Sequence, residues 1–209
     1  MSAADELIER IRLRLLPNPQ AAEVTATLVP DWMPEGGFDS PPRDAAVLIG
    51  LVHRGETLSV LYTERSPDLR SHSGQVAFPG GKIDPGDSGP AAAALREANE
   101  EVSLDPADAR VLGYMPAYFT GSNYMITPVV AEVRPHADFV ANPSEVRTVF
   151  EVPLPLLMKE ESFGPFRIRR RGQEHTTWQI EHEGPVIWGI TANLTRHFYE
   201  LVLRAEAAT

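Results

Sequence analysis

The stretch Arg96-Glu97-Ala98-Asn99-Glu100-Glu101 lies in a run of strong helix formers that begins at Ala91, directly after Pro90. Proline in the first helical turn loses no hydrogen bond, so the run predicts a helix that ends at Val102. At 100° per residue, Glu100 and Glu101 lie about 60° and 40° to either side of Glu97, so three carboxylates share one face. We expect the opposite face, with Leu95, Ala98 and Val102, to be buried.

Three like charges on one helix face repel one another, and a hard divalent cation with oxygen ligands would offset that repulsion. A solvated acidic surface is the alternative explanation of the same pattern. Upstream, Phe78-Pro79-Gly80-Gly81 predicts a tight turn after a strand, where backbone can approach a bound group closely. Asp84 and Asp87 add acids to the loop before the helix. Together these features favour a bound cation over a plain surface.

The loop and helix resemble the signature box of the Nudix hydrolase family. Here the box reads Gly81, five residues, Asp87, eight residues, and then Arg96 through Leu104. Four departures from the usual box are Asp87 for Glu, one extra loop residue, Ala98 for a larger aliphatic residue and Ser103 for Gly. The Arg-Glu-x-x-Glu-Glu core is intact.

A second motif, just before the box, is similar to that of the coenzyme A diphosphatase subgroup of the same family. It comprises Leu61-Tyr62-Thr63-Glu64-Arg65-Ser66, then Arg70, Gly74, Val76 and Phe78-Pro79-Gly80-Gly81. Only Tyr62 departs from the subgroup's pattern. The sequence Trp188-Gly189-Ile190-Thr191-Ala192 near the end also looks like the subgroup's form.

The resemblance implies an α/β fold, an α/β/α sandwich with a mixed sheet, and metal-dependent hydrolysis of a diphosphate linkage. Glu97, Glu100 and Glu101 would hold Mg²⁺ or Mn²⁺, and Arg96 would orient one of these glutamates through an ion pair. Two metals can clamp the attacking and leaving oxygens of such a reaction. We prefer Glu97 as general base; a distant loop is the alternative, with Glu160 and Glu161 as candidates that also fit plain loop surface. The catalytic set is therefore Glu97, Arg96 and Glu100.

With coenzyme A as substrate, the products would be 4′-phosphopantetheine and adenosine 3′,5′-bisphosphate. We expect Arg65 and Arg70 to contact substrate phosphate, because a planar guanidinium suits it, and Gly80 and Gly81 to approach the substrate closely. The basic run Arg167 to Arg171 would meet a 3′-phosphate or form a solvated hairpin edge. Three aromatic residues fit either the core or adenine stacking, with the core favoured: Trp178, Trp188 and Phe119.

Two other functions stay open at this point. A Nudix hydrolase for ADP-ribose, dinucleotides or another nucleoside diphosphate derivative would share the box, but the upstream motif argues against it. A catalytically silent binding module with the same fold would have no need of the intact three-glutamate face. A panel of substrates distinguishes these hypotheses.

The remaining pattern predicts a single α/β domain, residues 43–209, preceded by a helix and an irregular lead-in at 1–42 that pack on it. We expect helices at 4–16 and 191–205, with a short one near 157. Strands are expected at 45–52, 58–63, 75–78, 111–119, 125–133, 163–171, 176–180 and 188–190, the first two and the sixth and seventh as hairpins. The segment 143–157 is otherwise mixed.

Composition limits the function classes. The 209 residues carry 19 Lys and Arg against 29 Asp and Glu, a net charge of −10, which argues against nucleic-acid or membrane coating. A small phosphorylated substrate is still compatible, because a cation reverses the local sign. The absence of cysteine excludes disulfides and thiolate chemistry, and six histidines show no metal-ligand spacing. With no apolar span or secretory signal, we expect a cytoplasmic protein, monomeric or homodimeric, with a small-molecule substrate.

Overall fold

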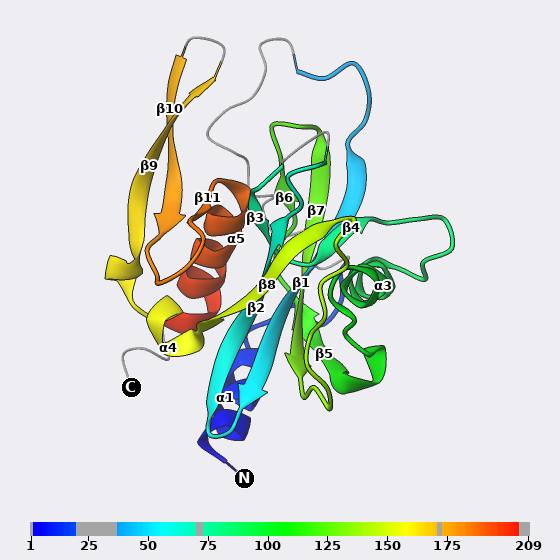
Figure 1. Ribbon diagram of the computed structural model, residues 1–209, viewed down its shortest axis with the longest axis vertical. Helices are drawn as coiled ribbons and strands as arrows, with labels where there is room; N and C mark the ends of the chain where they lie inside the picture. The colour runs from blue at the N-terminus through cyan, green and yellow to red at the C-terminus, as the bar shows by residue number, and fades with distance from the viewer. Residues whose placement is uncertain (1, 20–36, 70–72, 171–172, 205–209) are drawn as a thin grey trace.

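The central strand of the computed structural model is β1 (Arg43–Arg54), which joins the two halves of a mixed sheet (Figure 1). The structure describes residues 2–19, 37–69, 73–170 and 173–204. Strand β1 pairs antiparallel with β2 (Thr57–Arg65) and parallel with β7 (Tyr124–Val133). This arrangement confirms the predicted α/β class and the predicted first hairpin.

Five short strands complete this sheet. Strands β3 (Val76–Ala77) and β8 (Val146–Pro153) pair with β2, and β4 (Gly80–Lys82) pairs with the start of β1. Strands β5 (Ala109–Tyr114) and β6 (Tyr118–Phe119) pair with β7. A separate antiparallel sheet contains β9 (Phe163–Arg170), β10 (Gln173–Ile180) and β11 (Ile187–Trp188).

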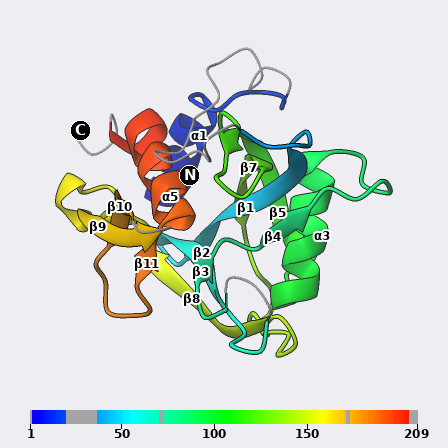
Figure 2. The ribbon, with the colours of Figure 1, turned by 90° about the horizontal axis from the view of Figure 1, so that it is seen from above.

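Helices cover both faces of the main sheet, as Figure 2 shows. Side chains alternate along β1, so Ala46 and Leu48 pack with α3 (Pro90–Val102) on one face. Ile49 and Leu51 point to the other face, where they share a core with α1 (Ala3–Arg12) and α5 (Ile190–Phe198). The α/β/α sandwich expected from the sequence is therefore confirmed.

The N-terminal helix α1 is held on the sheet by apolar burial and by its cap. Ser2 and Asp5 form a capping box, and Ile8 and Ile11 are fully buried in the core below α5. After the helix, Leu16 forms an isolated bridge with Tyr114. Most of the expected irregular lead-in, residues 20–36, lies outside the described residues.

Several element boundaries differ from the sequence prediction. The helix predicted to reach 16 ends at Arg12, and the strand predicted over 111–119 divides at Pro116 into β5 and β6. The mixed segment contains strand β8, followed by the short helix α4 (Leu154–Leu157). Ile190 begins α5 instead of ending a strand, and the closing helix continues as a π-helix, η3 (Tyr199–Leu203).

Two 3₁₀ turns complete the fold, η1 (Pro106–Asp108) and η2 (Glu160–Ser162). Among the described residues, no helix combines the length and the apolar character needed to cross a membrane.

Candidate functional site

Helix α3 begins and ends as its sequence dictates. Pro90 occupies the first turn, and Ser103 adopts a left-handed conformation (φ 56°) just past the last turn. A glycine would adopt this conformation without strain, which explains why the signature box usually has one there. Here Ser103 Oγ donates to the Val140 carbonyl at 3.2 Å, so the departure from the box comes with a compensating hydrogen bond.

The two glycines of β4 bring the backbone against the acidic helix. A side chain on Gly80 would overlap the Ala46 carbonyl and Val47 of β1, and one on Gly81 would overlap the Glu97 carboxylate. With glycine present, the Gly80 N–H donates to Glu101 Oε2 at 3.3 Å. The structure therefore gives these glycines a definite role in packing, while their predicted contact with substrate stays a prediction.

The three glutamates of α3 have different environments. The side chain of Glu101 is 3% exposed, that of Glu97 is 16% exposed and that of Glu100 is 51% exposed. Burial raises the pKa of Glu101 to about 8, although the Arg65 charge and the Gly80 N–H lower it. Burial also raises the pKa of Glu97, against the hydrogen bond from Arg96. Two of the three carboxylates are thus held where losing a proton is costly.

A residue from another part of the chain completes this acidic cluster. Glu97, Glu101 and Glu145 each place a carboxylate oxygen within 4.8 Å of the other two. Asn142 donates its N–H to the Glu101 carbonyl at 2.9 Å, and Ser66 N–H donates to the Glu145 carbonyl at 2.8 Å. These bonds hold the loop before β8 beside the end of α3.

Sequence reasoning missed Glu145, since no motif marks the residue and 44 positions separate it from Glu101. Glu100, predicted as a third ligand, does not belong to this group of three and instead pairs with Arg96. Its role as a ligand stays a prediction.

Arg96 connects the loop to the acidic face. Its guanidinium donates twice to Asp87, at 3.1 Å each, and its Nη1 lies 3.1 Å from Glu97 and 3.3 Å from Glu100. Asp87, followed by Glu97, raises the pKa of Arg96, and Arg96 in turn lowers that of Asp87. The predicted ion pair between Arg96 and a glutamate of the helix is present, and Asp87 fixes the arginine from the loop side.

Arg65 lies at the other side of Glu101. Its Nη1 is 3.7 Å from Glu101 Oε1, and its buried Nε has no hydrogen-bond partner among the described residues. The side chain is still a quarter exposed. This placement leaves an arginine next to the acidic cluster with capacity for an incoming anion. Arg70, the second predicted phosphate contact, lies outside the described residues.

The remaining candidates lie elsewhere in the fold. Glu160 of η2 lies 3.9 Å from Arg204 after α5, and neither it nor Glu161 is part of the acidic cluster. Trp178 stacks under Arg196, and Phe119 packs edge-on against Phe38. Trp188 faces Phe166, at 5.2 Å between ring centroids.

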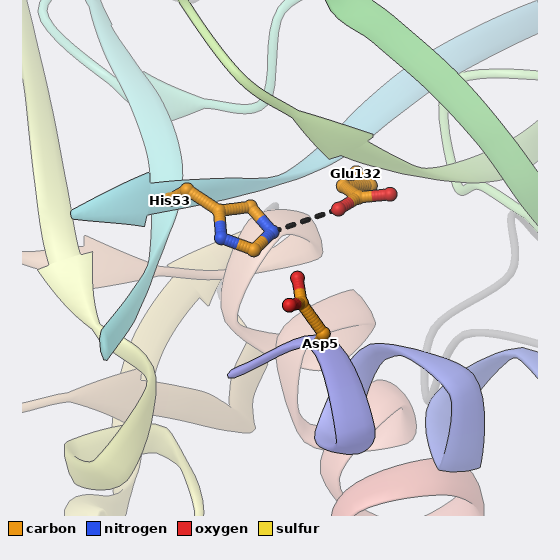
Figure 3. A group of neighbouring side chains, drawn as sticks. All are labelled: Asp5, His53 and Glu132. Carbon is orange, nitrogen blue, oxygen red and sulfur yellow. Dashed lines mark hydrogen bonds and ion pairs between the residues drawn. The ribbon is translucent and has the colours of Figure 1, made fainter. Parts of the chain in front are cut away.

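A second group with the geometry of a metal site consists of Asp5, His53 and Glu132 (Figure 3). His53 Nε2 lies 2.8 Å from Glu132 Oε1. Arg110 and Arg134 also pair with Glu132, and Arg134 pairs with Asp5. Because two arginines already neutralise its two carboxylates, we interpret this group as an ion-pair network that holds α1.

The acidic cluster, by contrast, fits a divalent cation. It offers three carboxylates, and hard cations such as Mg²⁺ prefer oxygen ligands. Two of these carboxylates, Glu97 and Glu101, have a raised pKa, which means that their ionised forms are poorly stabilised by the protein. A nearby cation would stabilise those ionised forms.

Comparisons with known proteins bear on the family of the chain. The family model described as NUDIX domain matches residues 41–175. A relative from Klebsiella pneumoniae (strain 342), named uncharacterized Nudix hydrolase NudL, is 41% identical over 79% of this chain and 84% of its own length. A relative of the same name from Escherichia coli (strain K12 / DH10B) is 43% identical over 74% and 80%. Among solved structures, DR0079 from Deinococcus radiodurans aligns with a TM-score of 0.48 at 18% identity, covering 75% of this chain and 83% of that one.

Proposed function

The chain belongs to the Nudix hydrolase family, enzymes that act on phosphoric anhydrides, and from that premise we propose that its substrate is coenzyme A or a derivative. Hydrolysis of the diphosphate linkage would give 4′-phosphopantetheine and adenosine 3′,5′-bisphosphate. The observation that carries this proposal is the position of Arg65, which belongs to the motif upstream of the box. Its guanidinium lies 3.7 Å from Glu101. The upstream motif and the acidic cluster therefore lie side by side.

Within this proposal, Glu97, Glu101 and Glu145 hold Mg²⁺ or Mn²⁺. When bound, the cation supplies positive charge at the phosphoryl oxygens and lowers the pKa of a neighbouring water. Arg96 holds Glu97 in place through a hydrogen bond to Oε1, while Asp87 holds Arg96. Gly80 orients Glu101 through its backbone N–H.

The reaction then needs a proton acceptor and a contact to the diphosphate. Water oxygen bonds to one phosphorus, its proton passes to Glu97, and the bond from that phosphorus to the bridging oxygen breaks. In this proposal Arg65 donates a hydrogen bond to a phosphoryl oxygen, and that bond strengthens as negative charge develops on the oxygen. Both groups lie beside Glu101, so the roles are compatible with one bound substrate.

Mass spectrometry of coenzyme A incubated with the protein and Mg²⁺ or Mn²⁺ tests the proposal, with ADP-ribose and NADH in parallel. We expect the two phosphorylated halves of coenzyme A, and no cleavage in the presence of a chelator. Selective cleavage of ADP-ribose or NADH would keep the family chemistry and refute the substrate. No turnover of any of the three would favour a silent binding module.

A further inference from the structure

A pocket among the described residues lies outside the acidic cluster. It has a volume of about 550 Å³ and is enclosed by the β9–β10 hairpin, β11, the start of α5, β3 and the turn before β7. We call it the hairpin pocket. Much of its lining, from Thr176 onward, follows residue 175, where the match to the family model ends. The pocket is therefore built in part, seven of its seventeen lining residues, by a segment that the family match does not include.

One side of the hairpin gives this pocket an aromatic and apolar wall. Strand pairing places Phe166 opposite Thr177 and Ile168 opposite His175, and residues directly opposite in antiparallel strands share a face. Trp188, 5.2 Å from Phe166 between ring centroids, extends the wall. Flat rings at the wall suit a heteroaromatic base, which stacks on such surfaces.

Polar groups inside the pocket form a fixed network. Thr177 Oγ1 donates to Asn193 Oδ1 at 2.9 Å, and Asn193 Nδ2 donates to the Tyr118 hydroxyl at 3.0 Å. Thr191 Oγ1 donates to the Val76 carbonyl, which ties the start of α5 to β3. The wall of the pocket is thus held rigid, as a specificity site requires.

Two arginines of β9, Arg167 and Arg169, also line the pocket, in a chain whose net charge is −10. Arg167 and Arg169 alternate with Phe166 and Ile168 along β9, so their exposed side chains leave the strand on the face opposite the aromatic wall and can reach a ligand only at the rim of the pocket. Glu174 lies opposite Arg169 in the hairpin, whereas Arg167 lies opposite the uncharged Thr176. A guanidinium at the rim of the pocket is suited to a phosphate monoester that projects out of the pocket.

Arg65 lies between the hairpin pocket and the acidic cluster. The backbone N–H of Arg65 donates to the carbonyl of Gln75, a lining residue of the pocket, at 3.0 Å. The guanidinium of Arg65 lies near Glu101. Along the chain, Val76 of the lining and Gly80 at the cluster are four residues apart, which spans at most about 14 Å. One substrate molecule can therefore occupy both.

We propose that the hairpin pocket binds the nucleotide half of the substrate, with its base against Phe166 and Trp188 and its 3′-phosphate at Arg167 and Arg169. This inference rests on the proposed function, because it assumes a substrate with a nucleoside 3′-phosphate on one side of the diphosphate. The pantetheine half, which has neither a ring nor a further phosphate, would extend away from this pocket.

Coenzyme A and its 3′-dephospho form differ only in the phosphate, so their comparison tests the arginines. In an Arg167→Ala/Arg169→Ala variant we expect KM for coenzyme A to rise about tenfold or more, with kcat and the KM of the dephospho form within about twofold. The matched control is Arg12→Ala/Arg14→Ala, which removes the same charge from the end of α1. Equal changes for both substrates, or none, would overturn the proposal.

A binding measurement distinguishes this inference from the catalytic proposal. Calorimetry on the metal-free protein needs no turnover, and we expect adenosine 3′,5′-bisphosphate to bind the wild type at least about tenfold more tightly than the double-arginine variant. Phe166→Leu, which keeps apolar volume but removes the ring, should weaken the same ligand. Binding of 4′-phosphopantetheine that depends on Phe166 would assign the pocket to the other half and refute the proposal.

Discussion

Two clusters in this protein bring a buried glutamate next to two further potential metal ligands. The pKa of that glutamate is raised in one cluster and lowered in the other. The side chains of Glu101 and Glu132 are almost equally buried, at 3% and 5% exposed. Burial raises the pKa of Glu101 to about 8. The charge of Arg65, at 3.7 Å, lowers this pKa but does not cancel the effect of burial. Burial acts on Glu132 in the same direction, but hydrogen bonds from Arg110 and then Arg134 hold its pKa below the usual value.

The difference separates the two clusters, and only the one around Glu101 is the proposed functional site. Around Glu132 the arginines neutralise the acids, so the network needs no further cation. Around Glu101 the additional charges are those of Glu97 and Glu145, which raise the electrostatic cost further. Geometry alone finds both groups of three, and only the balance of charge tells them apart.

The largest expected effect is the loss of turnover in Glu97→Gln. Replacing the carboxylate removes a ligand and the proposed proton acceptor, so we expect kcat to fall by at least about 10²–10⁴, with an unchanged circular dichroism spectrum. Glu132→Gln, the matched change in the other cluster, should keep kcat within about threefold when assayed well below its melting temperature. An unchanged rate in Glu97→Gln would remove Glu97 from the mechanism.

The next effect concerns Glu145, the member of the cluster that comes from a separate loop. In Glu145→Gln we expect the Mg²⁺ concentration for half-maximal activity to rise about 10- to 100-fold, which a metal titration of the rate measures. Glu160→Gln is the control, since Glu160 pairs with Arg204 away from the cluster. If both variants titrate like the wild type, Glu145 does not hold the cation.

These residues also show what the sequence can predict. Helical spacing and residue type correctly predicted α3 and the proline in its first turn, and the family resemblance predicted the pairing of Arg96 with a glutamate of the helix. All of these relations are local in the sequence. Helical spacing treated Glu97, Glu100 and Glu101 as equivalent, whereas the sheet and β4 bury two of them and leave Glu100 half exposed. Burial depends on neighbours that helical periodicity does not include.

Long-range relations were the ones that the sequence could not supply. Glu145 reaches the cluster through hydrogen bonds between the loop before β8 and both α3 and Ser66. His53 and Glu132 come together only because β1 and β7 run side by side in register. Strand β8 was missed for a related reason: its pairing with β2 brings together residues about 90 positions apart.

Stability should respond to the two glutamates with opposite signs. A folded-state pKa raised from 4.5 to about 8 means that the native metal-free protein binds a proton more tightly than the unfolded chain, so stability falls as pH rises between those values. Glu101→Gln removes that loss, and we expect about 1–3 kcal/mol of added stability at pH 8 in the presence of a chelator. Glu132→Gln leaves arginines without their partner and should destabilise by a similar amount.

Thermal denaturation measures both changes, and for a protein of this size about 1 kcal/mol corresponds to roughly 2–4 °C in Tm. Saturating Mg²⁺ should reverse the order for Glu101→Gln, because the wild type gains stability from the cation and the variant gains less. A lower Tm for Glu101→Gln without metal would contradict the charge-balance argument.

The smallest effect tests the ion-pair network at its exposed edge. A hydrogen bond from the Ser2 backbone, followed by those from Arg134 and the Ser2 side chain, lowers the pKa of Asp5 from 3.8 to about 2. A lowered folded-state pKa contributes stability that is present above pH 4 and is lost as pH falls toward 2. The Asp5→Asn variant should therefore be slightly less stable than the wild type at pH 7, and the difference should shrink as pH falls through about 2 and vanish below it. Urea unfolding of both proteins across this range measures it, with Glu6→Gln, a neighbouring exposed acid, as control. A difference that stays unchanged well below pH 2 would mean that Asp5 acts through the packing of α1 and not through its charge. The network would then stabilise the helix less than its geometry indicates.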